Sequence, residues 1–150
     1  MFTEQLTQAL SIPADPLPPV NRANNATAYT VGPVDMADFK RVMAIVTTGV
    51  LTGSANVQAY FQTCSISNGT FANISGGNTL TVAANNLTST LEVRADQIGS
   101  GNRYIQLAVL VNANSAFTSA YVLGGEANYK PASQFDDSDI PASRRLVSNI

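Results

Sequence analysis

Carboxylates are the side chains of this chain best suited to chemistry. In its central part they are Asp35, Asp38, Glu92, Asp96 and Glu126. Two facing carboxyl groups can hydrolyse a glycosidic bond, one as the acid and the other as base or nucleophile. Asp35 and Asp38, however, fall in a predicted turn, where aspartate commonly hydrogen-bonds its own backbone. Glu92 lies two residues before an arginine, and the chain has no tryptophan to form a sugar platform. We therefore expect no catalytic pair.

Other chemistry is limited by the absence of histidine, the commonest general base and metal ligand. Serine and cysteine triads are excluded, and Cys64, as the only cysteine, has no partner for a disulfide within the chain. Asp136, Asp137 and Asp139 offer oxygen ligands, but they lack the spaced glycine and glutamate of an EF-hand loop. No glycine-rich segment continues into the lysine and helix of a phosphate loop. The sequence predicts no enzyme, no metal, no cofactor and no small-molecule substrate.

Charge is scarce. Charged residues make up 12% of the chain, hydrophobic residues 45%, and positions 42 to 91 carry no charge at all. A monomer normally mixes charges over its surface to stay in solution. Two explanations fit this composition: a stable sandwich with a neutral, polar surface, or a domain whose surface is covered by partners in an assembly. We favour the assembly. The eight basic residues are scattered, which argues against nucleic-acid binding. Residues 1–10 contain an acid and no base, unlike a signal peptide or a membrane span.

The central sequence alternates polar and apolar residues with the period of two that is typical of half-buried strands. Turn signals such as Asn68-Gly69 separate the alternating segments, and we expect another turn or bulge at Gly124-Gly125. Short strands spaced in this way predict an all-β fold, an antiparallel β-sandwich of jelly-roll or Ig-like type. The expected strands are residues 27–31, 39–47, 55–64, 71–74, 79–84, 89–95, 103–112 and 116–123.

We predict three parts: an arm over residues 1–23, a sandwich over 24–130 and an extended tail over 131–150. The arm combines a short helix at Thr3–Leu10 with a proline-rich strap, Pro13–Pro19, that should hold it away from the body. Its apolar side chains Phe2, Leu6 and Leu10 have no partner within the segment. We expect them to contact a neighbouring subunit; the alternative is a disordered terminus.

Strand 39–47 has two apolar faces, which indicates burial on both sides, or burial on one side and an interface on the other. Arg41 is expected to share a face with Phe39, a costly place for an unpaired charge. We expect an internal partner, at Asp38, Glu92 or Asp96, and a cost of roughly 3–5 kcal/mol for Arg41→Ala. A partner on another subunit is the alternative. Arg94, the other arginine inside a strand, is the second candidate interaction residue.

Five strand segments carry a resemblance to a known group of proteins: Asp38–Val42, Asn56–Ala59, Leu91–Ala95, Arg103–Leu107 and Leu123–Pro131. Through them residues 36–132 resemble small structural proteins of tailed bacteriophages that are encoded among head genes and look like capsid decoration or cement proteins. The resemblance implies a virion protein, assembled in the host cytoplasm, whose partners are the major capsid protein and copies of itself, with a trimer slightly preferred. The proline-rich N-terminus has no counterpart in this resemblance.

The alternative function is a tail-associated or adhesin-type sandwich that binds a host glycan or protein. Aromatic side chains on loops would favour it. Tyr60, Tyr104, Phe117 and Tyr121 instead fall within predicted strands. A coding sequence beside a major capsid gene would favour decoration, and one beside tail-fibre genes would favour the adhesin.

Overall fold

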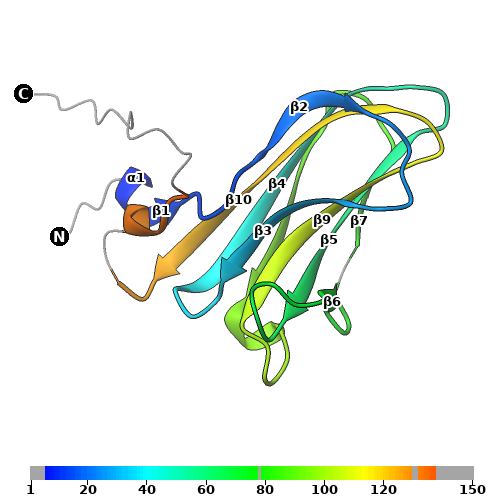
Figure 1. Ribbon diagram of the computed structural model, residues 1–150. Helices are drawn as coiled ribbons and strands as arrows, with labels where there is room; N and C mark the ends of the chain where they lie inside the picture. Colours follow the sequence, from blue (N-terminus) through cyan, green and yellow to red (C-terminus); the bar gives the residue numbers. More distant parts are fainter. Residues whose placement is uncertain (1–5, 78, 130–131, 138–150) are drawn as a thin grey trace, which may run out of the picture.

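Two antiparallel sheets packed face to face form the body of the molecule, so the expected β-sandwich is confirmed (Figure 1). The computed structural model describes residues 6–77, 79–129 and 132–137. In chain order the elements are α1 (Leu6–Ala9), β1 (Leu10–Ser11), β2 (Leu17–Arg22), β3 (Tyr29–Asp35), β4 (Phe39–Leu51), β5 (Asn56–Cys64), β6 (Ala72–Asn73), β7 (Leu80–Val82), β8 (Thr88–Arg94), the 3-10 turn η1 (Ala95–Gln97), β9 (Tyr104–Asn112), β10 (Ala116–Ala127) and the 3-10 turn η2 (Ala132–Phe135).

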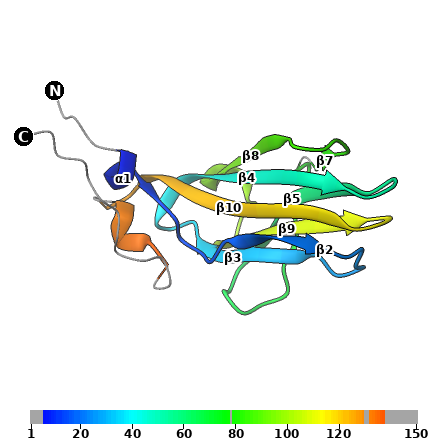
Figure 2. The ribbon, with the colours of Figure 1, turned by 90° about the horizontal axis from the view of Figure 1, so that it is seen from above.

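Sheet A has the order β8-β4-β10, with both β1 and β2 paired to the far side of β10 (Figure 2). Sheet B has the order β3-β9-β5, with the short strands β6 and β7 both paired to β5. Each of the eight expected strands has a counterpart, and β4 and β10 run longer than expected. No helix in the described ranges is long and apolar enough to cross a membrane.

The core lies between the sheets and is built from alternate residues of the long strands. Val42, Ala44 and Val46 of β4 are fully buried, as are Leu107 and Val109 of β9. Removing these apolar side chains from water is the main force holding the two layers together. The core positions follow the period-two pattern in the sequence, because successive strand residues point to opposite faces.

The N-terminal strap does not stand away from the body, so that expectation is wrong. Leu17 of β2 pairs with Ala120 of β10 and packs against the core, and Ala14 is 4% exposed. Pro18 and Pro19 fit here because an edge strand needs its backbone N–H groups on one side only. Prolines therefore mark this segment as an edge strand. Of the predicted helix, the structure describes α1; Phe2 lies outside the described residues.

Gly124 and Gly125 form no turn but continue β10, which corrects the sequence-based expectation. A Cβ on Gly124 would lie 2.5 Å from the Phe39 ring. Glycine is required here because the ring of Phe39 occupies the space of a side chain. Phe39 also contacts the edge of Phe135, with ring centroids 5.4 Å apart.

The first part of the predicted C-terminal tail is tied to the N-terminal segment. Ile12 donates its N–H to Asp136 Oδ1 at 2.8 Å, and Asp137 donates its N–H to the Ile12 carbonyl at 2.9 Å. Residues 132–137 therefore pack beside α1 and β1 instead of extending away (Figure 1). Asp139 lies outside the described residues.

Candidate interaction face

The side of sheet A that faces away from the core is the candidate functional surface. In β4 the residues between the buried positions, Met43 and Ile45, are half-buried and are not packed against the core. Tyr121 and Leu123 stand in the same way on β10. The sequence left open whether β4 is buried on both faces or on one. In the structure one face of β4 lies in the core and the other is directed outward. We call this surface the outer face of sheet A; its residues are Leu10, Arg41, Met43, Ile45, Glu92, Arg94, Phe117, Tyr121 and Leu123.

The strand register arranges these side chains in rows. Ile45 lies directly opposite Tyr121, and Met43 lies opposite Leu123. On its other side Met43 lies opposite Glu92 of β8. Directly opposed side chains on one face of a sheet contact each other. Two adjacent rows of two side chains each therefore form an apolar centre, with the Glu92 carboxylate at its margin.

Arg41 stands at the polar margin of this face, which corrects the expectation that it shares a buried face with Phe39. Its side chain is 47% exposed, whereas Phe39 is 1% exposed. The alternation breaks at the start of β4, where two consecutive residues are exposed before the buried run begins at Val42. Arg41 Nε lies 3.1 Å from Glu126 Oε2, and Nη1 lies 3.5 Å from Glu92 Oε1. Glu92 was among the expected partners; Glu126 was not, because the expected turn at Gly124-Gly125 hid its place on β10.

The structure brings three of the five candidate interaction residues together. Arg94 lies directly opposite Arg41 across β4 and β8, and its guanidinium pairs with Asp96 at 3.1 Å. Leu10 lies opposite Gly125 on the other side of the same row. Leu6, on α1, is 76% exposed and stands apart from them. The role of these residues in binding stays a prediction.

A further ion pair, at the same end of the sandwich, joins Asp35 to Arg103, with Arg103 Nη2 2.6 Å from Asp35 Oδ2. Burial alone would raise the pKa of Asp35, but hydrogen bonds from Arg103 and the Ala37 N–H, together with the guanidinium charge, lower it. Burial and then the charge of Asp35 raise the pKa of Asp38. The Ala37 N–H bond to Asp35 Oδ1, at 2.9 Å, is the turn bond expected from the sequence.

These contacts leave the central carboxylates in structural roles. Four of the five central carboxylates form an ion pair with an arginine: Asp35, Glu92, Asp96 and Glu126. Within the described ranges no group of three or more histidine, cysteine or carboxylate side chains could hold a metal. Cys64 is buried at the end of β5, the strand-end position expected for it.

The outer face of sheet B has a different character: it carries amides and tyrosines in place of apolar rows. Gln106 donates to Gln62 at 2.9 Å, and Gln62 donates to Asn73 at 3.0 Å, so amide side chains bridge three strands. Asn112 donates to Asn56 at 3.1 Å further along the sheet. This face is polar, and the charged groups at its end, Asp35 and Arg103, pair with each other beside Tyr104.

The sequence matches no protein-family model and no curated protein. Among solved structures, it is similar to a chain in a structure of infectious bursal disease virus, Gt strain, with a TM-score of 0.42 and 14% identity over 80% of this chain and 33% of that chain. A chain from the Gx strain gives a TM-score of 0.39 and 15% identity over 83% of this chain and 34% of that chain. The present chain thus spans about a third of each viral chain.

Proposed function

We propose that this chain is a non-enzymatic structural protein of a virus particle that decorates a phage head by docking the outer face of sheet A onto the major capsid protein. The observation that carries the proposal is the pair of outward rows formed by Met43, Ile45, Tyr121 and Leu123. An apolar centre bordered by charged side chains is the usual anatomy of a protein interface. Side chains that pack on no core of their own gain most from burial against a partner.

The arrangement of charge supports the same proposal. Arg41 pairs with both Glu92 and Glu126 at the margin of the face, so its charge and most of theirs are already compensated before a partner docks. Assembly with other copies of the chain, with a trimer slightly preferred, belongs to this proposal, because shell proteins occupy symmetric positions.

The proposal is tested with Ile45→Lys on the outer face of sheet A and Gln58→Lys on the outer face of sheet B. Both positions are half-buried and lie in central strands, so the two variants introduce the same charge on opposite sides of the sandwich. Binding to heads of the encoding phage is measured by co-sedimentation, and the oligomeric state by light scattering. We expect Ile45→Lys to weaken head binding by ten-fold or more, because a buried charge without a partner is costly, and Gln58→Lys to leave it unchanged. A wild-type monomer that binds no heads would overturn the proposal, as would equal binding by both variants.

The outer face of sheet B favours a second candidate, the adhesin-type module. Tyr60 and the bridged amides of Gln62 and Gln106 combine a ring face with uncharged donors and acceptors. Such groups suit a polyhydroxylated glycan, which also lacks charge. A glycan array distinguishes the two: binding that Tyr60→Ala abolishes and Ile45→Lys leaves intact would support the adhesin.

A further inference from the structure

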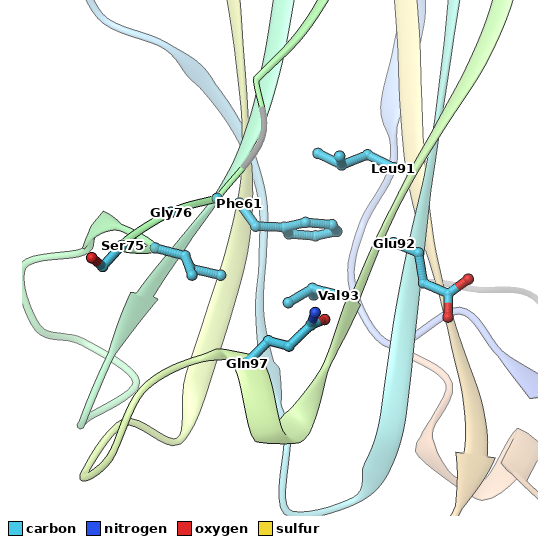
Figure 3. Close-up of a pocket in the computed structure, with 9 residues that line it drawn as sticks. Phe61, Ser75, Gly76, Leu91, Glu92, Val93 and Gln97 are labelled. Carbon is cyan, nitrogen blue, oxygen red and sulfur yellow. The ribbon is translucent and has the colours of Figure 1, made fainter.

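A cavity of about 290 Å³ opens between the two sheets beside the edge of β8 (Figure 3). Phe61 of β5 extends into it, between Leu91 and Val93 of β8. Ile74, in the loop after β6, contributes a further apolar wall. Gln97 stands at the lower rim, and the Glu92 carboxylate points away from the cavity. The cavity therefore has an apolar floor, formed by these side chains, within a larger polar rim.

The cavity exists because the edge of sheet B is interrupted at this point. β7 pairs with β5 as far as Ala59, and β6 pairs with it only from Gln62. Between them Phe61 keeps a single long bond, from the Ile74 N–H to its carbonyl at 3.4 Å. Residues 74–77 line the cavity at this gap, and the Phe61 ring forms part of its wall although the residue is only 5% exposed.

β8 borders this cavity with a free strand edge, since among the described residues it pairs with β4 alone. Thr48 donates its N–H to the Leu87 carbonyl at 2.8 Å, so these opposed residues form a hydrogen-bonded pair. Every second residue then faces β4 in the same way, which assigns the β4 bonds to Ser89, Leu91 and Val93. The N–H and C=O groups of Thr90 and Glu92 consequently face the open side.

The end of this edge is capped. Like Thr90 and Glu92, Arg94 directs its main-chain N–H to the open side of β8. This N–H donates to Gln97 Oε1 at 2.9 Å. The other long outer strands are blunted against strand pairing: β2 carries Pro18 and Pro19, and β3 carries Pro33. Proline on an edge removes the donors that a further strand would need. The edge of β8 has no proline and keeps its donors.

We propose that the edge of β8 and the adjoining cavity bind an extended strand of another protein, with apolar residues at two alternate positions and a lysine or arginine between them. The residues opposite Leu91 and Val93 would face inward, toward Phe61. The residue between them would lie opposite Glu92 on the outer surface, where a basic side chain would share the carboxylate with Arg41, whose Nη1 lies 3.5 Å from Glu92 Oε1. Strand addition of this kind takes its affinity from main-chain bonds and its specificity from pockets for alternate side chains.

A second copy of β8 does not meet these requirements. Antiparallel self-pairing that places Leu91 opposite Val93 also places Glu92 opposite Glu92, and like charges in direct opposition are destabilising. Self-pairing centred on Leu91 avoids that contact but puts Ser89 opposite Val93, where it leaves the cavity unfilled. The occupant is therefore a strand of different sequence. This site shares Glu92 with the outer face of sheet A, but the cavity and the main-chain donors of β8 lie outside that face, and the inference does not rest on the proposed function.

The test uses the unaltered full-length chain, labelled with ¹⁵N, and the capped peptide Thr-Thr-Leu-Lys-Val-Thr-Thr, followed by NMR. We expect saturable shifts at the amides of Thr90, Glu92 and Arg94. N-methylation of the peptide lysine removes a bond to Glu92 and should abolish binding. N-methylation of the peptide valine, whose N–H faces away from β8, should leave it intact. Replacing the peptide lysine by glutamate should weaken binding about two- to five-fold.

A variant of the protein checks the same geometry from the other side. Thr90→Pro removes an outward donor and no bond to β4, and Thr90→Val keeps the donor with a side chain of the same shape. We expect Thr90→Pro to lose the peptide shifts and Thr90→Val to retain them. No shift up to the solubility limit of the peptide, equal binding by the two N-methylated peptides, or shifts confined to sheet B would each overturn the proposal.

Discussion

Arg41 on β4 and Arg94 on β8 lie directly opposite each other across the outer face of sheet A. Like charges in this relation normally destabilise a sheet. Here each guanidinium forms ion pairs with carboxylates of its own. Arg41 pairs with Glu126 and Glu92, and Arg94 pairs with Asp96. The two opposed arginines are thus each compensated by carboxylates, at the end of the sandwich beside an apolar centre.

Arg41→Ala should therefore cost far less than a buried staple would. The side chains of Arg41 and of its acids Glu92 and Glu126 are about half exposed, and such ion pairs contribute roughly 0–1 kcal/mol. We expect the melting temperature to fall by less than about 4 °C for a domain of this size. Differential scanning calorimetry measures it, with Lys40→Ala as the exposed control. Gln62→Ala is no neutral control, because Gln62 bonds to Gln106 and Asn73. A fall above about 8 °C for Arg41→Ala would contradict the exposed geometry.

The loss of folding stability at acidic pH should depend on Asp35. Its pKa is lowered in the folded chain, so its contribution is present above the ordinary aspartate pKa and is lost as pH falls through the lowered value. Asp35→Asn should flatten the loss of melting temperature as pH falls below the ordinary aspartate pKa, and should lower stability at pH 7. An unchanged pH profile in this variant would show that Arg103 gives Asp35 no advantage.

Asp38 should behave in the opposite sense. Its pKa is raised by burial and by Asp35, so the folded state favours the protonated form, and stability is lost as pH rises through the raised value. Asp38→Asn removes the ionised form and should raise the melting temperature at pH 7, with little effect well below the ordinary aspartate pKa. A lower melting temperature at pH 7 would contradict this sign.

The sandwich was predictable because inward and outward residues alternate along each strand. The sequence could not show which of the two apolar faces of β4 packs in the core. Met43 and Ile45 look like core residues, and only the position of β4 in sheet A shows that they face outward. Glu126 was missed because a turn was expected at Gly124-Gly125, whereas β10 continues through both glycines and carries Glu126 beside Arg41. The N-terminal strand was missed because proline argues against a central strand but is compatible with an edge strand, such as β2.

Gly124→Ala should destabilise the fold, whereas Gly125→Ala should not. A Cβ at position 124 would lie 2.5 to 2.8 Å from three atoms of the buried Phe39 ring, and overpacking of this kind costs roughly 1–3 kcal/mol. At position 125 the nearest atom is Leu10 Cδ2, at an ordinary contact distance of 3.6 Å. Chemical denaturation of the two variants measures the difference. Equal free energies of unfolding would show that the Phe39 ring can move aside.

Removal of residues 1–23 should destabilise the sandwich instead of leaving its thermal transition unchanged. A chain starting at Asn24 lacks β2, so the edge of β10 that pairs with it becomes exposed, and Leu17 is lost from the core boundary. Burial of one such side chain contributes about 1.5–3 kcal/mol. We expect the melting temperature to fall by roughly 4–12 °C, as 2–3 kcal/mol gives in a domain of this size.

Two point variants separate this effect from loss of the terminus as such. Leu17→Ala removes the contact with the core and should lower the free energy of unfolding by about 1–3 kcal/mol. Leu6→Ala changes a side chain that is 76% exposed and should stay within about 0.5 kcal/mol of wild type. If the shortened chain melts with the full-length protein and Leu17→Ala is neutral, β2 contributes nothing to the fold, and the N-terminal segment is an independent arm after all.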